Sequence, residues 1–104
     1  MSANVHLGHG RVLAVQAVPY TASSAQATNP FGPQTFHIRV VANSDCHVKV
    51  GIGSVTATTS DLFLPASVVD YLMVTPGETI AAIEAATNGL VTATAGTLNV
   101  TELG

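Results

Sequence analysis

Strand-forming residues occur in this sequence as short runs that glycine and proline interrupt, and this pattern restricts the possible folds most strongly. The 104 residues include 14 Val and 13 Thr, with nine Gly and five Pro between the runs. Val and Thr favour strands, whereas Gly and Pro favour turns. We therefore expect an all-β, single-domain fold of about seven or eight strands: a β-sandwich, a jelly roll or a small barrel. Residues 11–104 are assigned to this domain and residues 1–10 to an N-terminal arm.

Two neighbouring segments show the clearest alternation of apolar and polar side chains. Their apolar positions are Phe36, Ile38 and Val40, then Cys46, Val48, Val50 and Ile52. The odd-numbered link Asn43–Asp45 predicts a hairpin in which Val40 lies opposite Val48, because an even link would set apolar residues against polar ones. The other face of this hairpin would carry four basic or titratable side chains together: His37, Arg39, His47 and Lys49.

These four side chains are the predicted contact residues. They form a candidate anion-binding strip, and the alternative is an ordinary solvated sheet face. If the strip docks on an acidic neighbour, protonation of its two histidines changes the association, so assembly should vary with pH near about 6. Assembly that stays constant from about pH 5 to 8 would contradict this interpretation.

The remaining segments give weaker signals. Residues 11–18 predict a strand that is apolar on both faces, as in the middle of a sheet or at an intersubunit contact, and Pro19 is expected to end it. Residues 20–34 predict a long loop. Residues 79–86 fit either an Ala-rich helix or, as we favour, a strand whose hairpin turn is Asn88-Gly89.

Further strands are expected over residues 66–74, 90–94 and 97–103, with a turn at residues 75–78 that has Pro and Gly at its centre. Residues 54–60 predict a strand or an extended loop. The residues predicted for the core are Phe36, Ile38, Val40, Val48, Val50, Ile52, Leu64, Tyr71 and Val74.

Charge is scarce in this chain. Only 9% of the residues are charged while 47% are hydrophobic, whereas an average soluble protein has about 25% charged residues. Three basic and six acidic side chains cannot cover the surface of a lone subunit of this size. Such a surface is typical of a subunit that is buried against other chains. We therefore predict a homo-oligomer, either a dimer or a trimer.

The charges also argue against two classes and are unevenly distributed. Disorder requires low hydrophobicity with high net charge, and nucleic-acid binding requires more than three Lys and Arg residues. Residues 1–50 hold three bases and one acid (+2), while residues 51–104 hold five acids and no base (−5). The two halves could match within one subunit or between subunits.

Few residues suggest chemistry. Adjacent strand residues point to opposite faces, so Cys46 and His47 do not form a nucleophile–base pair, and the single cysteine is interpreted as a buried small side chain. His6 and His9 have a spacing that could hold a metal, but a site needs further ligands. Converging carboxylates and phosphate-binding glycine motifs are not evident. We expect no enzymatic activity, no cofactor and no metal.

Membrane insertion and secretion are not expected. The apolar stretch 62–74 is shorter than the roughly 20 residues of a spanning helix, and it contains Pro65 and Asp70. The N-terminus lacks the basic start and the apolar run of a secretory signal.

Six short elements follow one another in the chain: His47–Gly51, Ala57-Thr58, Asp61–Ala66, Asp70-Tyr71, Val74–Glu78 and Val100–Leu103. Their order, over residues 36–103, resembles that of small virion structural proteins of tailed bacteriophages. The resemblance includes no catalytic motif, and residues 11–34 lie outside it.

The resemblance implies a β-rich virion subunit that is made in the host cytoplasm. Such a subunit is a cement or decoration protein that stabilises the outer capsid lattice by burying surface on the major capsid protein, or it is a tail or head-fibre component. The alternative from another class is a carbohydrate- or small-ligand-binding β-sandwich, which the scarcity of aromatic residues (5%) disfavours.

Overall fold

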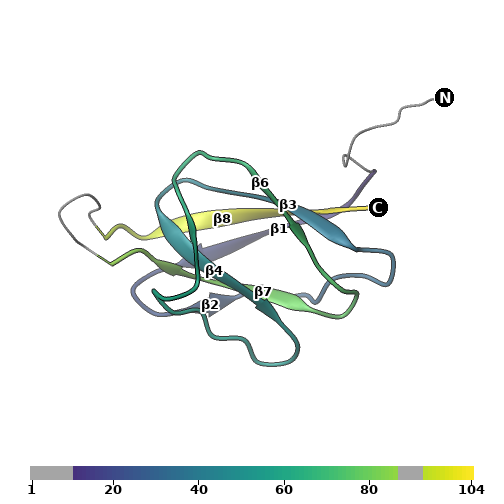
Figure 1. Cartoon of the computed structure of the whole chain (residues 1–104), viewed down its shortest axis with the longest axis horizontal. Helices are drawn as coiled ribbons and strands as arrows, with labels where there is room; N and C mark the ends of the chain where they lie inside the picture. The colour runs from purple at the N-terminus through teal and green to yellow at the C-terminus, as the bar shows by residue number, and fades with distance from the viewer. Residues whose placement is uncertain (1–10, 87–92) are drawn as a thin grey trace.

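A computed structural model of the chain describes residues 11–86 and 93–104, and these residues form eight strands (Figure 1). The strands are β1 (Val12–Tyr20), β2 (Ala25–Gln26), β3 (His37–Ala42), β4 (Cys46–Gly51), β5 (Leu62–Leu64), β6 (Asp70–Met73), β7 (Thr79–Glu84) and β8 (Gly96–Leu103). No described residue lies in a helix, which confirms the all-β prediction and the favoured strand within residues 79–86. The predicted Asn88-Gly89 turn and most of the predicted strand over residues 90–94 lie outside the described residues.

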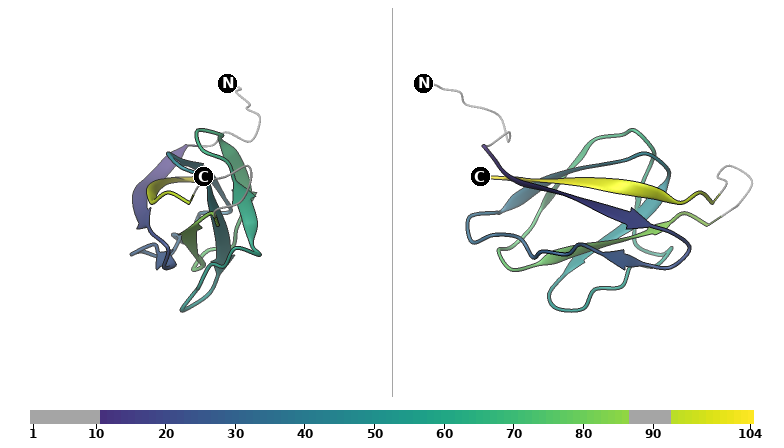
Figure 2. Two further views of the ribbon diagram at one scale, coloured as in Figure 1. Left: turned by 90° about the vertical axis from the view of Figure 1, so that its left-hand side faces the viewer. Right: turned by 180° about the vertical axis from the view of Figure 1, so that it is seen from behind.

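The eight strands form two antiparallel sheets around one core (Figures 1 and 2). Sheet one has the order β1-β8-β3-β6, and sheet two has the order β2-β7-β4-β5. Every strand pair joins a strand from residues 12–51 to a strand from residues 62–103. The basic and acidic halves of the chain therefore interleave within one subunit and do not form separate faces.

The predicted hairpin between residues 36 and 52 is wrong, because its two strands lie in different sheets. In sheet one, Val40 of β3 pairs with Val100 and Asp70; in sheet two, Val48 of β4 pairs with Ala82 and Leu62. Val40 and Val48 are both buried, as the alternation predicts. Their apolar faces meet across the core rather than side by side, which satisfies the same period-two pattern.

A polar corner carries the chain from β3 to β4. The hydroxyl of the buried Tyr20 donates to the Ser44 carbonyl oxygen at 2.7 Å and lies 2.7 Å from Ser44 Oγ. The Asn43 N–H donates to the Thr97 carbonyl oxygen, and the Thr97 N–H donates to Asn43 Oδ1. These bonds tie the link to β1 and to the start of β8, so the chain changes sheets instead of reversing within one. Burial also raises the pKa of Tyr20.

The core agrees with the prediction except where a residue lies beyond a strand or on an outer face. Ile38, Val40, Val48, Leu64 and Val74 are buried, and Val50 is half-buried. Phe36 and Ile52 are exposed because β3 begins at His37 and β4 ends at Gly51. Tyr71 is exposed because it lies opposite Arg39, on the outer face of sheet one.

β7 shows why an alanine-rich segment forms a strand here. It lies between β2 and β4, and its first four residues are fully buried. Ile80 and Ala82 face the common core, whereas Ala81 packs on the other side against Val55 and Ala57. The loop over residues 52–61 thus covers part of the outer face of sheet two, and small side chains give it room to approach. Residues 54–60 accordingly form a loop and no strand.

β1 is an edge strand, so the alternative of a strand in the middle of a sheet is wrong. Val12 is 59% exposed and Val15 is 57% exposed. Pro19 does not end this strand, which continues to Tyr20. Proline is tolerated in an edge strand when its position needs no ladder donor.

Two segments, one predicted as a loop and one as a strand, differ from their predicted form for local reasons. The predicted loop over residues 20–34 contains β2, which pairs with β7. β6 begins at Asp70 rather than at residue 66, because Ser67 adopts a positive φ of 64° and donates its N–H to the Ala42 carbonyl oxygen at 2.7 Å.

The predicted turn at residues 75–78 is confirmed by the hydrogen bond from the Glu78 N–H to the Thr75 carbonyl oxygen, with Gly77 at φ 89°.

A buried carboxyl group fastens the loop before β3 to β8. Glu102 is only 5% exposed, and its Oε1 accepts hydrogen bonds from the Gly32 N–H at 2.9 Å and from the fully buried Thr35 hydroxyl at 2.7 Å. Polar groups this deep in a protein are stabilised only when they have such partners.

Replacing Thr35 by Val should therefore lower the free energy of unfolding by about 1 to 2 kcal/mol, because Glu102 would lose a donor inside the protein. Urea denaturation measures this change. Thr56→Val is the matched control, since Thr56 is exposed, and it should leave stability within about 0.5 kcal/mol. Equal losses in the two variants would contradict this account of Glu102.

Candidate interaction surfaces

The outer face of sheet one carries several exposed apolar side chains, and no described segment packs on it as a second layer. Because directly paired residues share a side of the sheet, the outer side chains follow from the register. Those that we call the open face are Val12, Val15, His37, Arg39, Tyr71 and Met73. Met73 is the most exposed large apolar side chain of the described residues, at 83%. Exposed apolar side chains gathered in this way are typical of contact sites.

Two further features of the open face suit a bound partner. His37 Nε2 is buried and has no hydrogen-bond partner among the described residues, so a docked group could satisfy it. Toward the other end of β3, the face is hollowed over a volume of about 360 Å³, lined in part by Val41, Thr97 and Asn99.

The four predicted contact residues do not form one strip. His37 and Arg39 lie on the open face, whereas His47 and Lys49 lie on the outer face of sheet two, because their strands belong to different sheets. His47 is engaged locally: its Nδ1 lies 2.9 Å from the Asp61 carbonyl oxygen, and its ring packs on Phe63 with centroids 5.3 Å apart. Each pair remains a predicted contact on its own face.

The carboxylates near turns accept hydrogen bonds from the main chain. Asp61 Oδ2 accepts the Thr58 N–H at 2.7 Å, and Glu78 Oε1 accepts the Thr75 N–H. Asp70 Oδ1 accepts the N–H of Tyr71 at 2.9 Å. These groups stabilise loops and are not paired with one another.

A small pocket lies on the outer side of sheet two, and sequence reasoning did not find it. The chain leaves β7 after Ala27, whose N–H donates to the Ile80 carbonyl oxygen, and returns at Phe31, whose N–H donates to the Glu78 carbonyl oxygen. The residues between them bulge away and leave a hollow of about 250 Å³. It is lined by Gln26, Ala27, Thr28, Pro30, Gly53, Gly77 and Thr79. No periodic pattern signals such a bulge.

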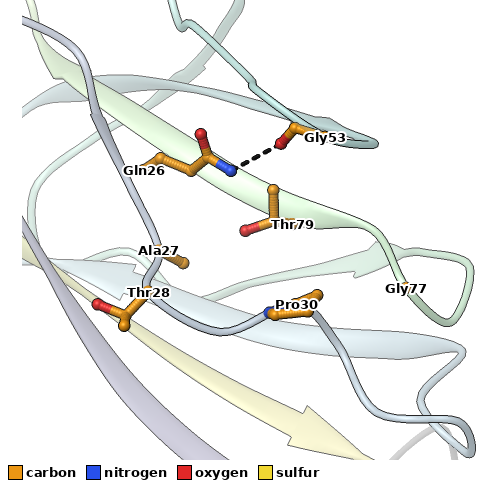
Figure 3. A pocket seen from close by; sticks show the side chains of 7 residues that line it. All are labelled: Gln26, Ala27, Thr28, Pro30, Gly53, Gly77 and Thr79. Carbon is orange, nitrogen blue, oxygen red and sulfur yellow. Dashed lines mark hydrogen bonds between the residues drawn. The ribbon is translucent and has the colours of Figure 1, made fainter.

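The polar groups of this pocket are uncharged. Figure 3 shows Thr79 between Pro30 and the hydrogen bond that Gln26 Nε2 donates to the Gly53 carbonyl oxygen at 2.8 Å. Thr79 is 4% exposed, and its Oγ1 has no hydrogen-bond partner among the described residues. The pocket can therefore accept a small neutral group that bonds to a hydroxyl, including a water molecule.

The described residues contain no group of three or more His, Cys, Asp or Glu side chains that could hold a metal. His6 and His9 lie outside those residues. No helix in the described part of the chain is long and apolar enough to cross a membrane.

Comparison with known proteins adds no relative. No protein-family model matches the chain, and no curated protein or solved structure matches it.

Cys46 is fully buried beside Tyr20 and faces the core. Burial raises the pKa of its thiol to about 11 from an ordinary 9.0. The thiol is therefore protonated and unreactive at neutral pH, as expected for a packed core residue.

The buried Cys46 thiol stays protonated up to about pH 11 in the folded chain, whereas the same thiol in the unfolded chain ionises at about pH 9. The stability that Cys46 contributes is therefore fully present below about pH 9 and is lost as the pH rises toward about 11. The free energy of unfolding should fall over that range, and it should fall less steeply in Cys46→Ala, with Tyr20 supplying the remaining slope. Denaturation at a series of pH values measures both slopes. Rapid alkylation of the native thiol by iodoacetamide at pH 8 would contradict the burial argument.

Proposed function

We propose that this chain is a non-enzymatic structural subunit of a bacteriophage virion, and specifically a cement protein that binds the outer capsid lattice. In this role the subunit stabilises the shell by burying surface against the major capsid protein and against its own copies. Burial of apolar area contributes about 25 cal/mol per Å² before the cost of ordering is subtracted.

The open face is the observation that carries this proposal. It presents Met73, Tyr71, Val12 and Val15 around a single fixed charge, that of Arg39. Exposed apolar side chains gathered on one face are typical of a surface that contacts another protein, as a subunit that lies on a shell does.

The strand order supports a finer assignment of the fold. We assign a jelly roll, which is a double sheet of eight strands that contains two Greek keys and occurs in viral capsid proteins. The orders β1-β8-β3-β6 and β2-β7-β4-β5 fit this fold, since β8 lies between β1 and β3 while β7 lies between β2 and β4.

A second function, a small-ligand-binding module, is favoured by one observation, the unpartnered Thr79 hydroxyl in the neutral pocket. Jelly rolls also occur in lectins. Binding on a glycan array by the wild type but not by Thr79→Val would support this module in place of the cement protein.

Charge reversal on the two outer faces tests which face docks. Arg39→Glu should weaken binding to virions that lack the chain by about tenfold, because it places a wrong charge at the centre of the open face. Lys49→Glu makes the same change on the other sheet and should alter binding less than about twofold. Binding is measured by cosedimentation with particles. Equal effects of the two reversals would contradict docking through the open face.

Deletion of residues 1–10 tests the predicted arm. The domain should stay folded, because the described strands begin at Val12, while assembly weakens if the arm reaches a neighbour. Circular dichroism and light scattering measure the two properties. Unchanged oligomer mass and particle binding would overturn the arm's role, and labelling of intact particles at the tail alone would replace the cement function by a tail or fibre function.

A further inference from the structure

β1 is the one long open edge of the two described sheets. The other edge strands are short: β6 has four residues, β5 has three and β2 has two, whereas β1 has nine. In the described part of the chain, β1 pairs only with β8, beside which it runs in the right-hand view of Figure 2. A long edge presents unpaired N–H and C=O groups and is a template for another strand.

The register shows which main-chain groups of β1 are free. The Thr97 carbonyl oxygen accepts the Asn43 N–H, so the main chain of Thr97 points toward β3. In an antiparallel sheet this direction alternates, so Asn99 and Thr101 also point toward β3. Their partners on β1, Ala17 and Val15, therefore point away from β8 toward the open edge.

Pro19 agrees with this geometry. It lies opposite Thr97, so its nitrogen also points to the open edge, where the missing N–H removes no bond to β8.

β1 carries no charged residue, which narrows the choice of partner. The sequence of the strand is VLAVQAVPY, and Val12, Leu13 and Val15 are all exposed. An acidic or basic partner strand would find no opposite charge here, and no lysine of β1 opposes self-pairing. The two features of β1 that hinder an added strand, Pro19 and the irregular register between Val12 and Ala14, lie near its two ends and leave residues 15–18 regular. A second copy of the strand meets no repulsion, and a twofold axis matches the surface to itself.

We propose that β1 pairs antiparallel with β1 of a second copy, with Val15 of each chain opposite Ala17 of the other and Gln16 at the twofold axis. This register pairs the free N–H and C=O groups of both residues in both chains. Gln16 can lie at the axis without losing a bond, because its main chain points to Val100 of β8 and its side chain bonds the Asn29 main chain of its own subunit.

This pairing joins the two copies of sheet one into a continuous eight-stranded sheet. A twofold axis between antiparallel strands of one sheet is perpendicular to that sheet, so both open faces point to the same side. The dimer would then present two copies of Met73 and Arg39 to one flat partner, and binding through both copies multiplies the affinity. The inference deepens the proposed function, and it rests on that proposal only for the identity of this flat partner.

Site-resolved amide exchange of the full chain tests the pairing directly. At concentrations where light scattering gives a dimer, the amides of Val15 and Ala17 should exchange at least about tenfold more slowly than in a dilute, monomeric sample. In a single copy both amides face solvent, so protection that rises with concentration reports the second strand.

Ala17→Pro removes an outward-pointing N–H, as Pro19 does, and should raise the dimer dissociation constant by about tenfold or more, since the twofold axis doubles the loss. Val15→Lys serves as a second variant if Ala17→Pro does not fold. Ile52→Lys is the matched control, because Ile52 is 76% exposed on a turn outside β1, and it should leave the dimer intact.

A wild type that stays monomeric at about 1 mM, or a dimer that survives both edge variants with fast amide exchange at Val15 and Ala17, would overturn the pairing. Particle binding distinguishes this failure from failure of the proposed function. A monomer that still binds virions through Arg39 leaves the cement function in place, whereas a β1-paired dimer that binds no virion removes it.

Discussion

Scarcity of charge is the constraint from which the other surface properties of this subunit follow. The chain has three basic and six acidic side chains, and most of the acids are engaged within the fold. The carboxylates that accept main-chain N–H groups belong to Asp45, Asp61, Asp70, Glu78 and Glu102. Carboxylates used in this way hold loops in place, so few charges remain to keep a broad surface hydrated.

The two sheets deal with this shortage differently. Sheet two supplies its own cover, since the loop over residues 52–61 packs Val55 and Ala57 on Ala81 and Ile83. Sheet one has no such loop in the described structure, and Val12, Val15, Tyr71 and Met73 on its outer face remain exposed. One outer face of the molecule is therefore covered by its own chain and the other is not, which is the asymmetry expected if the proposed docking through sheet one is correct.

The sequence was sufficient to predict which residues are buried but not which strands are neighbours. Period-two alternation identified Ile38, Val40 and Val48 as core residues, because burial depends only on the face of a strand. Pairing depends on the link between strands. The polar link Asn43–Asp45 fits a turn as well as a corner, and the choice depends on Tyr20 and Thr97, which lie far away in the sequence. The same limit divided the predicted contact strip between two faces.

Other features had no local signal at all. The pocket at Thr79 arises from a bulge whose two ends are fixed by β7, and the exposure of β1 arises from its place at the edge of a sheet. Apolar residues on both faces of β1 were compatible with a central strand or with a contact between subunits. The structure excludes the first, and the second remains a prediction.

The interleaving of the two halves has a consequence for when the two sheets can form during synthesis. β8 is the last strand of the chain, yet it fills the middle of sheet one between β1 and β3. Before the second half of the chain has been synthesised, β1 has no strand to pair with, because its neighbour is β8. Pairing between strands this far apart in the sequence is also slow. The open edge of β1 and the open face therefore acquire their shape only when β8 has been synthesised, so any docking through them has to wait for the complete chain.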